Sequence, residues 1–276
     1  MPGSYLAVGA FSWVALLGSL LAMLLLADAA AGHLARGFDR PAQYVPFAVG
    51  VPFALIAVAA AVAGGPGWAA AGLRLTGWLM AAAGLIGTGF HHWHGMARKP
   101  GGYRWALHHA MYGAPPLAPL GLALVGVIGM AASAGIAGET HALGIALRPL
   151  LLLTVAMGLA GALLQAAVLH LRGAFNNALM YLPFTAPLLA AALAACATLA
   201  PAPLLLAVTA ALFWLTALVG FIGLGMHLRG FDRQRGGLFL PFLNWLSGPP
   251  AMAPSLFVAL AFLGLTAIHL IPGGPP

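Results

Sequence analysis

Most of this chain consists of apolar runs that are long enough to cross a lipid bilayer as helices. The hydrocarbon core of a bilayer requires about 20 apolar helical residues. Of the residues, 62% are hydrophobic and only 5% are charged, which leaves too little polar surface for a water-soluble domain. The sequence therefore predicts an all-α polytopic membrane protein. We expect eight transmembrane helices, at approximately residues 5–32, 43–64, 68–93, 105–132, 143–170, 178–200, 203–227 and 239–271.

Basic residues are concentrated in the connections on one side of the predicted membrane. The other side carries only Arg74 and Arg148, with Glu139. Since cytoplasmic loops are enriched in Lys and Arg, we expect a multi-pass protein of a bacterial inner (plasma) membrane with both termini outside. The charge of +7 then predicts contact with the lipid bilayer and no nucleic-acid partner. The nine basic residues on the predicted cytoplasmic side are Arg36, Arg40, Arg98, Lys99, Arg104, Arg172, Arg229, Arg233 and Arg235.

The two halves of the sequence resemble each other. His33 and the following Tyr44-Val45-Pro46-Phe47 recur 137 residues later as His170 and Tyr181-Leu182-Pro183-Phe184. Nine residues between His92 and Pro119 recur at a constant offset of 135, between His227 and Pro254. We therefore predict a tandem duplication of a four-helix unit, 1–137 and 138–276. An even number of spans gives both copies the same orientation, which is a parallel repeat.

Each predicted hairpin carries a histidine before its cytoplasmic loop and a polar residue after it. The four pairs are His33 with Tyr44, His92 with His109, His170 with Tyr181, and His227 with Asn244. A proline follows in every hairpin and frees a backbone carbonyl, which membranes tolerate only inside protein or beside water. The pattern predicts a polar, ligand-binding layer near the cytoplasmic face. In the simpler interpretation, these histidines cap helix ends, worth about 0.3–1 kcal/mol each, and the tyrosines anchor the interface.

Imidazole chemistry leaves several ligands open for this layer. Haem b requires two facing imidazoles and arginines for its propionates, whereas quinone requires only hydrogen-bonding groups beside a flat apolar cleft. Asp28, an acid within a span, is expected to handle protons, unless it pairs with Arg36 or Arg40. A metal site in the second hairpin is a further prediction, because imidazole binds transition metals. Its candidate ligands are His91, His92, His94, His108 and His109.

Three other classes of function compete with a redox role. A proton-coupled transporter or channel would use parallel repeats and proline-broken helices, but the outer halves of the spans are mostly Ala, Leu, Val and Gly. A His-rich membrane metalloenzyme would need a second histidine cluster, which the second half lacks. A scaffold without a ligand would use its polar pairs only to bond each other. The lone Cys196 excludes a disulfide framework and a thiolate metal cluster.

The topology resembles that of the NrfD-like, quinone-interacting membrane anchors of polysulfide and DMSO reductases. The likeness covers the whole chain in its eight spans, but in motif it rests on "HLRGFDRQRGGLFLPFLNWLSGPP" at 227–250. That family has an HLGxPxR run, whereas Arg229 and Gly230 are in swapped order here, and an acidic residue after the serine is missing. The resemblance implies a membrane subunit that exchanges electrons with quinone and binds a separate soluble or membrane redox subunit. It assigns no site residue.

Overall fold

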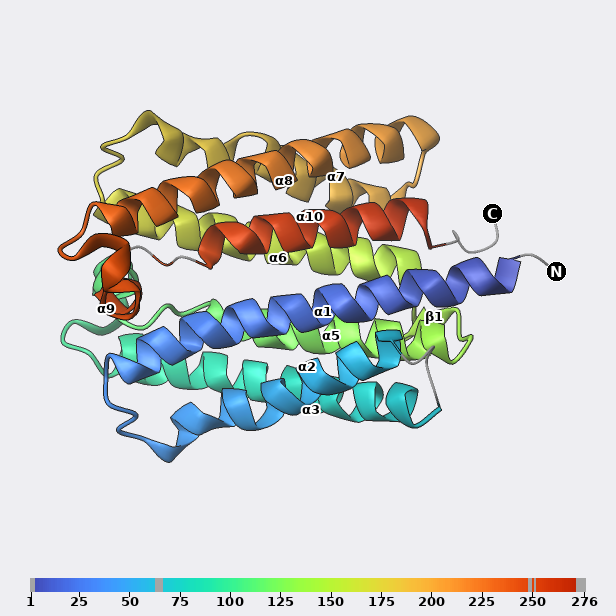
Figure 1. Ribbon diagram of the computed structural model, residues 1–276, viewed down its shortest axis with the longest axis horizontal. Coiled ribbons are helices and arrows are strands. Elements are labelled where there is room, and N and C mark those ends of the chain that lie inside the picture. Colours follow the sequence, from blue (N-terminus) through green and yellow to red (C-terminus); the bar gives the residue numbers. More distant parts are fainter. Residues whose placement is uncertain (1–2, 63–66, 248–249, 251, 272–276) are drawn as a thin grey trace.

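Long helices run side by side along the whole molecule (Figure 1). The computed structural model describes residues 3–62, 67–247, 250 and 252–271. Seven helical segments of this described part are long and apolar enough to span a membrane, and a shorter one, α10, has 17 residues. The all-α membrane fold is confirmed, while the count of eight spans is not. The long helices are α1 (Gly3–Leu34), α2 (Val45–Val62), α3 (Gly67–His92), α5 (Ala118–Ile136), α6 (Leu147–Arg172), α7 (Ala186–Leu199), α8 (Pro203–Asp232) and α10 (Ala253–His269).

Two of the predicted spans are broken near the basic loops. The run 105–132 divides into the short helix α4 (Ala106–Tyr112) and α5, and the run 239–271 divides into α9 (Pro241–Ser247) and α10. A continuous span over 105–132 was therefore a wrong prediction, whereas the prolines of the run 239–271 had left a break there open. The cause in the first half is Pro115-Pro116, because proline lacks the amide hydrogen that a helix needs and its ring excludes helical backbone in the residue before it.

Short turns complete the described chain. Residues Trp93–Ala97 extend α3 as a π-helical turn (η2), and His141–Ala142 (β1) pairs antiparallel with Ile145–Ala146 (β2). The remaining short elements are single 3-10 segments: η1 (Pro41–Tyr44), η3 (Gly102–Trp105), η4 (Ala178–Phe184) and η5 (Gly237–Phe239).

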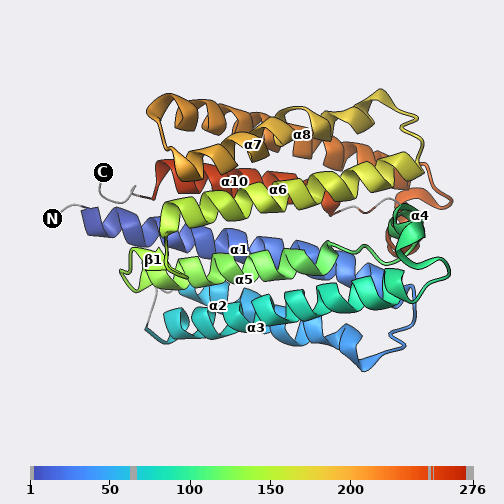
Figure 2. The ribbon, with the colours of Figure 1, turned by 180° about the vertical axis from the view of Figure 1, so that it is seen from behind.

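The helices of the two halves pack in the same order. In the first half α1 packs on α2 and α5, and α3 packs on α2 and α5; in the second half α6 packs on α7 and α10, and α8 packs on α7 and α10. The halves meet through α1 with α10 and α5 with α6. The short helices cross between them, α4 to α6 and α9 to α1 (Figures 1 and 2). The duplication itself stays a prediction from the sequence.

Glycines permit the close crossing of helices in each half. A Cβ on Gly84 of α3 would lie 2.7 Å from the Pro119 carbonyl oxygen of α5, and one on Gly220 of α8 would lie 2.9 Å from the Pro254 oxygen of α10. A bilayer gives helices no hydrophobic reason to associate, so close backbone approach supplies van der Waals contact instead. These glycines therefore hold the outermost helices, α3 and α8, to the bundle.

The two ends of the bundle differ in charge. The start of α1 and the end of α10 lie at the same end of the bundle as the β1–β2 hairpin (Figure 1). The opposite end carries the nine basic residues, all of them exposed; seven lie in its loops, and Arg172 and Arg229 lie in the last turns of α6 and α8. Below, "the basic end" denotes this end, which contains loops 35–44, 98–105, 173–185 and 233–240.

Thiol labelling in cells tests the predicted orientation. In a Cys196→Ala background, we expect Thr140→Cys to react with a membrane-impermeant maleimide in whole cells and Lys99→Cys to react only after permeabilisation. Both side chains are exposed and lie at opposite ends of the bundle, and the positive-inside rule predicts that the basic end faces the cytoplasm. The reverse labelling pattern would place the termini inside.

Candidate functional site at the basic end

Two hairpins carry the same cluster of aromatic rings. The His33 ring lies 5.7 Å from the Phe38 ring, and Phe38 stacks on Tyr44 at 4.7 Å. Their counterparts in the second half lie at 5.8 Å and 4.7 Å. Phe38 and its counterpart Phe175 both have positive φ, of 49° and 47°, a conformation that only a tightly packed turn holds in a non-glycine residue. The phenylalanine therefore separates each histidine from its predicted tyrosine partner.

The tyrosines of these hairpins face outward. Tyr44 and Tyr181 are each 55% exposed, and neither is hydrogen-bonded to a histidine within the described residues. Interfacial tyrosines of this kind anchor a membrane protein at the headgroups. The predicted role of Tyr44 and Tyr181 in cofactor binding stays a prediction, and the geometry favours anchoring.

Three histidines make the same hydrogen bond to a backbone carbonyl. The Nδ1 atom of His91 lies 2.8 Å from the Pro115 oxygen, that of His170 2.8 Å from the Met180 oxygen, and that of His227 2.8 Å from the Pro250 oxygen. A carbonyl only accepts, so Nδ1–H is the donor and Nε2 of the neutral ring retains its lone pair. Histidines that bind metals or exchange protons are commonly oriented by this bond.

The structure corrects one predicted equivalence between the halves. His91 occupies the position of His227, whereas the sequence aligned His92 with it. The first half has one additional residue before the loop, and the π turn Trp93–Ala97 absorbs it, with the Arg98 amide bonding the Trp93 oxygen five residues back at 3.0 Å. In the second half α8 continues as an α-helix to Asp232. Inserted residues are often accommodated as π-bulges, which are frequent at functional sites.

The displaced His92 has a different environment. Its ring lies 6.4 Å from the Tyr103 ring, and it makes no hydrogen bond within the described chain. His91 was expected only as a metal ligand, and its proline-carbonyl bond went unpredicted. The sequence did contain a sign of the correct alignment. Gly84 and Gly87 recur as Gly220 and Gly223 at an offset of 136, which is also the offset between His91 and His227.

The short helices α4 and α9 differ at equivalent positions. Asn244 of α9 is 5% exposed, and its amide donates to the Gly237 oxygen at 2.6 Å and to the Phe231 oxygen at 3.4 Å. His109 of α4 has a buried Nε2 atom without a hydrogen-bond partner. Asn244 is therefore occupied in holding α9 to the end of α8, while His109 is unsatisfied.

The five histidines of the second hairpin have separate neighbours. His94 stacks on Phe90 at 5.9 Å, with its Nδ1 atom 3.3 Å from Nη1 of Arg40. His108 lies 5.0 Å from the Tyr112 ring. In the described part of the chain, no three His, Cys, Asp or Glu side chains are grouped so as to hold a metal ion. The metal site thus stays a prediction from the sequence, without a ligand set in the geometry.

Asp28 lies inside the bundle without a charged partner. It follows Val14, Leu21 and Leu24 along the buried face of α1, where these three are at most 9% exposed, and Asp28 itself is half-buried. Its carboxylate makes no hydrogen bond or ion pair with any residue that the structure describes, so pairing with Arg36 or Arg40 is not observed. Its counterpart in the second half, at the offset of 137, is Gln165. An unpaired carboxylate in a membrane span is costly and functional by default.

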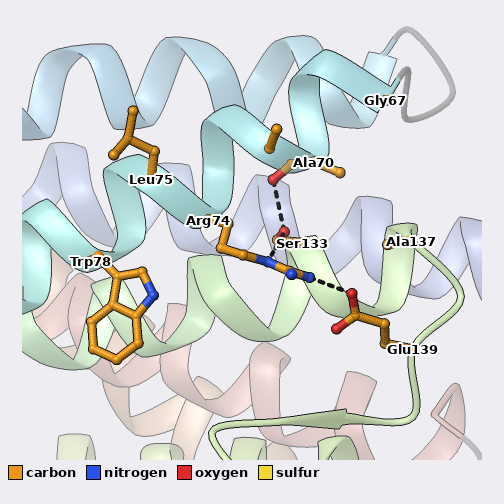
Figure 3. A pocket seen from close by; sticks show the side chains of 9 residues that line it. Gly67, Ala70, Arg74, Leu75, Trp78, Ser133, Ala137 and Glu139 are labelled. Carbon is orange, nitrogen blue, oxygen red and sulfur yellow. Dashed lines mark hydrogen bonds and ion pairs between the residues drawn. The ribbon is translucent and has the colours of Figure 1, made fainter.

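The opposite end contains a shallow hollow that the sequence did not predict. It has a volume of about 470 Å³, and Arg74, Trp78, Ser133 and Glu139 line it (Figure 3). Arg74 forms an ion pair with Glu139 at 2.6 Å, and Ser133 donates to the Ala70 oxygen at 2.7 Å. No histidine lines this hollow. Because Arg74 and Glu139 neutralise each other and are half-exposed, we assign the pair to anchoring α3 to the loop after α5.

No protein-family model, curated protein or solved structure matches this chain.

Proposed function

We propose that this chain is an integral membrane subunit of a redox system and exchanges electrons with quinone at its basic end. The observation that carries the proposal is the bond from His91 Nδ1 to the Pro115 carbonyl at a helix break, which leaves Nε2 as an acceptor. A quinol hydroxyl is a suitable donor to that nitrogen. Oxidation of the quinol then releases two electrons to a partner redox subunit and two protons, of which His91 accepts the first.

Asp28 is a suitable acceptor for a further proton in this proposal. It is half-buried on α1, no residue described by the structure neutralises it, and it lies deeper in the membrane than His33. A carboxylate without a partner gains stability when it is protonated, because the neutral acid is far less costly to bury. We place Asp28 on the path by which protons leave the quinol.

Haem b fits the described residues less well than quinone. A bis-histidine haem needs two imidazoles that face each other across an open slot. Phe38 covers His33 at 5.7 Å, and Phe175 and Phe184 lie against His170 at 5.8 Å and 6.5 Å. These phenylalanines take up space beside the two rings. We therefore propose quinone as the reactant and derive no step through haem.

The transporter alternative finds less support in the packing of the bundle. A carrier needs polar groups that remain available to a solute along the path. The buried hydroxyls of Thr76, Thr154, Thr209, Thr216 and Thr266 each bond the carbonyl four residues earlier in their own helix, at 2.7–2.8 Å. Such hydroxyls are satisfied locally and offer no hydration path.

Quinone content of the purified protein tests the proposal. We expect organic extracts of the detergent-purified protein to contain quinone near one equivalent per chain, and a quinol analogue to bind with saturable affinity. An absorbance scan in the same experiment tests for haem. Protein that contains no quinone and does not bind the analogue contradicts the proposal.

A further inference from the structure

We infer that the duplicated bundle is functionally asymmetric: the first half holds the quinone site, although His91 and His227 make the same bond, because three other equivalent positions of the second half carry neutral or hydrogen-bonded groups. This inference rests on the proposed function for its ligand and adds which copy of the repeat is active. The inference comes from comparing three equivalent positions, because each carries an unsatisfied titratable group in the first half and a neutral or bonded group in the second.

The first pair is His33 and His170. The Nδ1–H group of His170 donates to the Met180 oxygen at 2.8 Å, whereas the ring of His33 contacts Phe38 and makes no hydrogen bond within residues 3–62, 67–247, 250 and 252–271. His33 therefore keeps both ring nitrogens for a ligand or water. In the second copy the same residue type has one ring nitrogen held by its loop, whereas His33 has none.

The second pair, Asp28 and Gln165, and the third pair, His109 and Asn244, differ in the same direction as the first. Asp28 is an unpaired acid, and Gln165 replaces it with an uncharged amide. His109 has a buried, unpartnered Nε2, and Asn244 in its place makes two hydrogen bonds to backbone oxygens. Buried polar groups without partners cost free energy unless a ligand or water satisfies them. Among the described residues, His109 Nε2 is the one buried side-chain atom of this kind, and it belongs to the first copy.

The π turn adds a fourth, independent difference. Trp93–Ala97 departs from the α-helix only in the first half, immediately after the paired His91 and His92. A π turn is less stable than α-helix and persists where it positions functional groups. It lets His91 keep its proline-carbonyl bond while the loop that follows keeps the same geometry as in the second half, with φ of 76° at Gly101 and 81° at Gly236.

The imidazole and the carboxylate that α1 contributes in the first half lie at different depths. Asp28 is five residues before His33, about 7.5 Å deeper along the helix. Five residues turn a helix by about 140°, so His33 and Asp28 lie on different faces of α1. We assign the imidazole to the quinol headgroup at the membrane edge, and the carboxylate to the path by which a proton leaves.

The matched variants His33→Phe and His170→Phe test this asymmetry, because phenylalanine keeps the ring packing and removes the nitrogens. We expect His33→Phe to weaken binding of the quinol analogue about tenfold, the loss of one hydrogen bond, with an unchanged Tm. His170→Phe is expected to lower Tm by about 2–4 °C, since it loses a structural bond, and to leave the affinity within about twofold.

Each outcome decides a separate point. Equal loss of affinity in both variants, or a lower Tm for His33→Phe with full affinity, overturns the asymmetry while the quinone function stands. Wild-type protein that does not bind the analogue removes the proposed function and this inference together. Should His33→Phe fail to fold, His33→Gln keeps a polar side chain and is measured in the same way.

Discussion

Replacing Gly84 with valine is expected to separate α3 from α5 and to prevent the protein from reaching its folded state. The added Cβ would lie 2.7 Å from the Pro119 oxygen and still closer to the Ala123 nitrogen. Both are backbone atoms, so no side chain can rotate to make room. Overpacking in a close-packed interior commonly costs about 1–3 kcal/mol, and a clash with two backbone groups of a neighbouring helix exceeds that range. A total stability of about 5–15 kcal/mol leaves little reserve.

Gly89→Val is the matched control for this variant. Gly89 lies five residues further along the same helix, and a Cβ there meets nothing within 4 Å. Both variants replace glycine with valine inside α3, so the change in helix propensity is the same. They differ only in whether the new side chain meets α5. Size-exclusion elution in detergent and thermal unfolding compare them, and we expect Gly89→Val to behave like the wild type. Equal behaviour of both variants would show that α3 and α5 do not approach as closely as the glycine contact indicates.

The fold class followed from the sequence because a long apolar run has few alternatives to a membrane helix. The positions of the helix breaks were harder to predict from the sequence. Residues 105–132 are apolar enough to be taken as one span, yet Pro115 and Pro116 separate α4 from α5. Hydropathy averages over a window, whereas the loss of a backbone donor acts at a single residue. The local rule for proline predicted a bend, but not that the short helix would cross to the other half.

The sequence predicted which types of residue lie at the candidate site, but not which groups they hydrogen-bond. Histidines near the basic loops were expected, and His170 and His227 do lie there beside backbone carbonyls. An alignment without gaps matched His92 to His227. It could not show the single residue inserted in the π turn of the first half, because the residues after the turn align at the offset of 135. The partners of Asn244 are carbonyls brought near by tertiary packing, which no pattern along the chain encodes.

Asn244→Leu is expected to destabilise the protein, whereas His109→Asn at the equivalent position is expected to stabilise it. Asn244 is 5% exposed and donates to the oxygens of Gly237 and Phe231. Leucine has a similar volume and removes both donors, so the variant loses the link between α9 and α8. Removing a satisfied buried polar group from its partners costs about 1–3 kcal/mol.

The opposite sign at position 109 follows from the symmetry of the two halves. Met96 and Gly102 stand 135 residues before Phe231 and Gly237, so we expect an asparagine at 109 to donate to the two equivalent carbonyl oxygens. It also removes the buried, unpartnered Nε2 of His109, and the expected gain is about 1 kcal/mol. Thermal unfolding of both variants measures these effects. Destabilisation by His109→Asn would mean that the imidazole already has a partner, such as a bound water or ligand, which asparagine fails to replace.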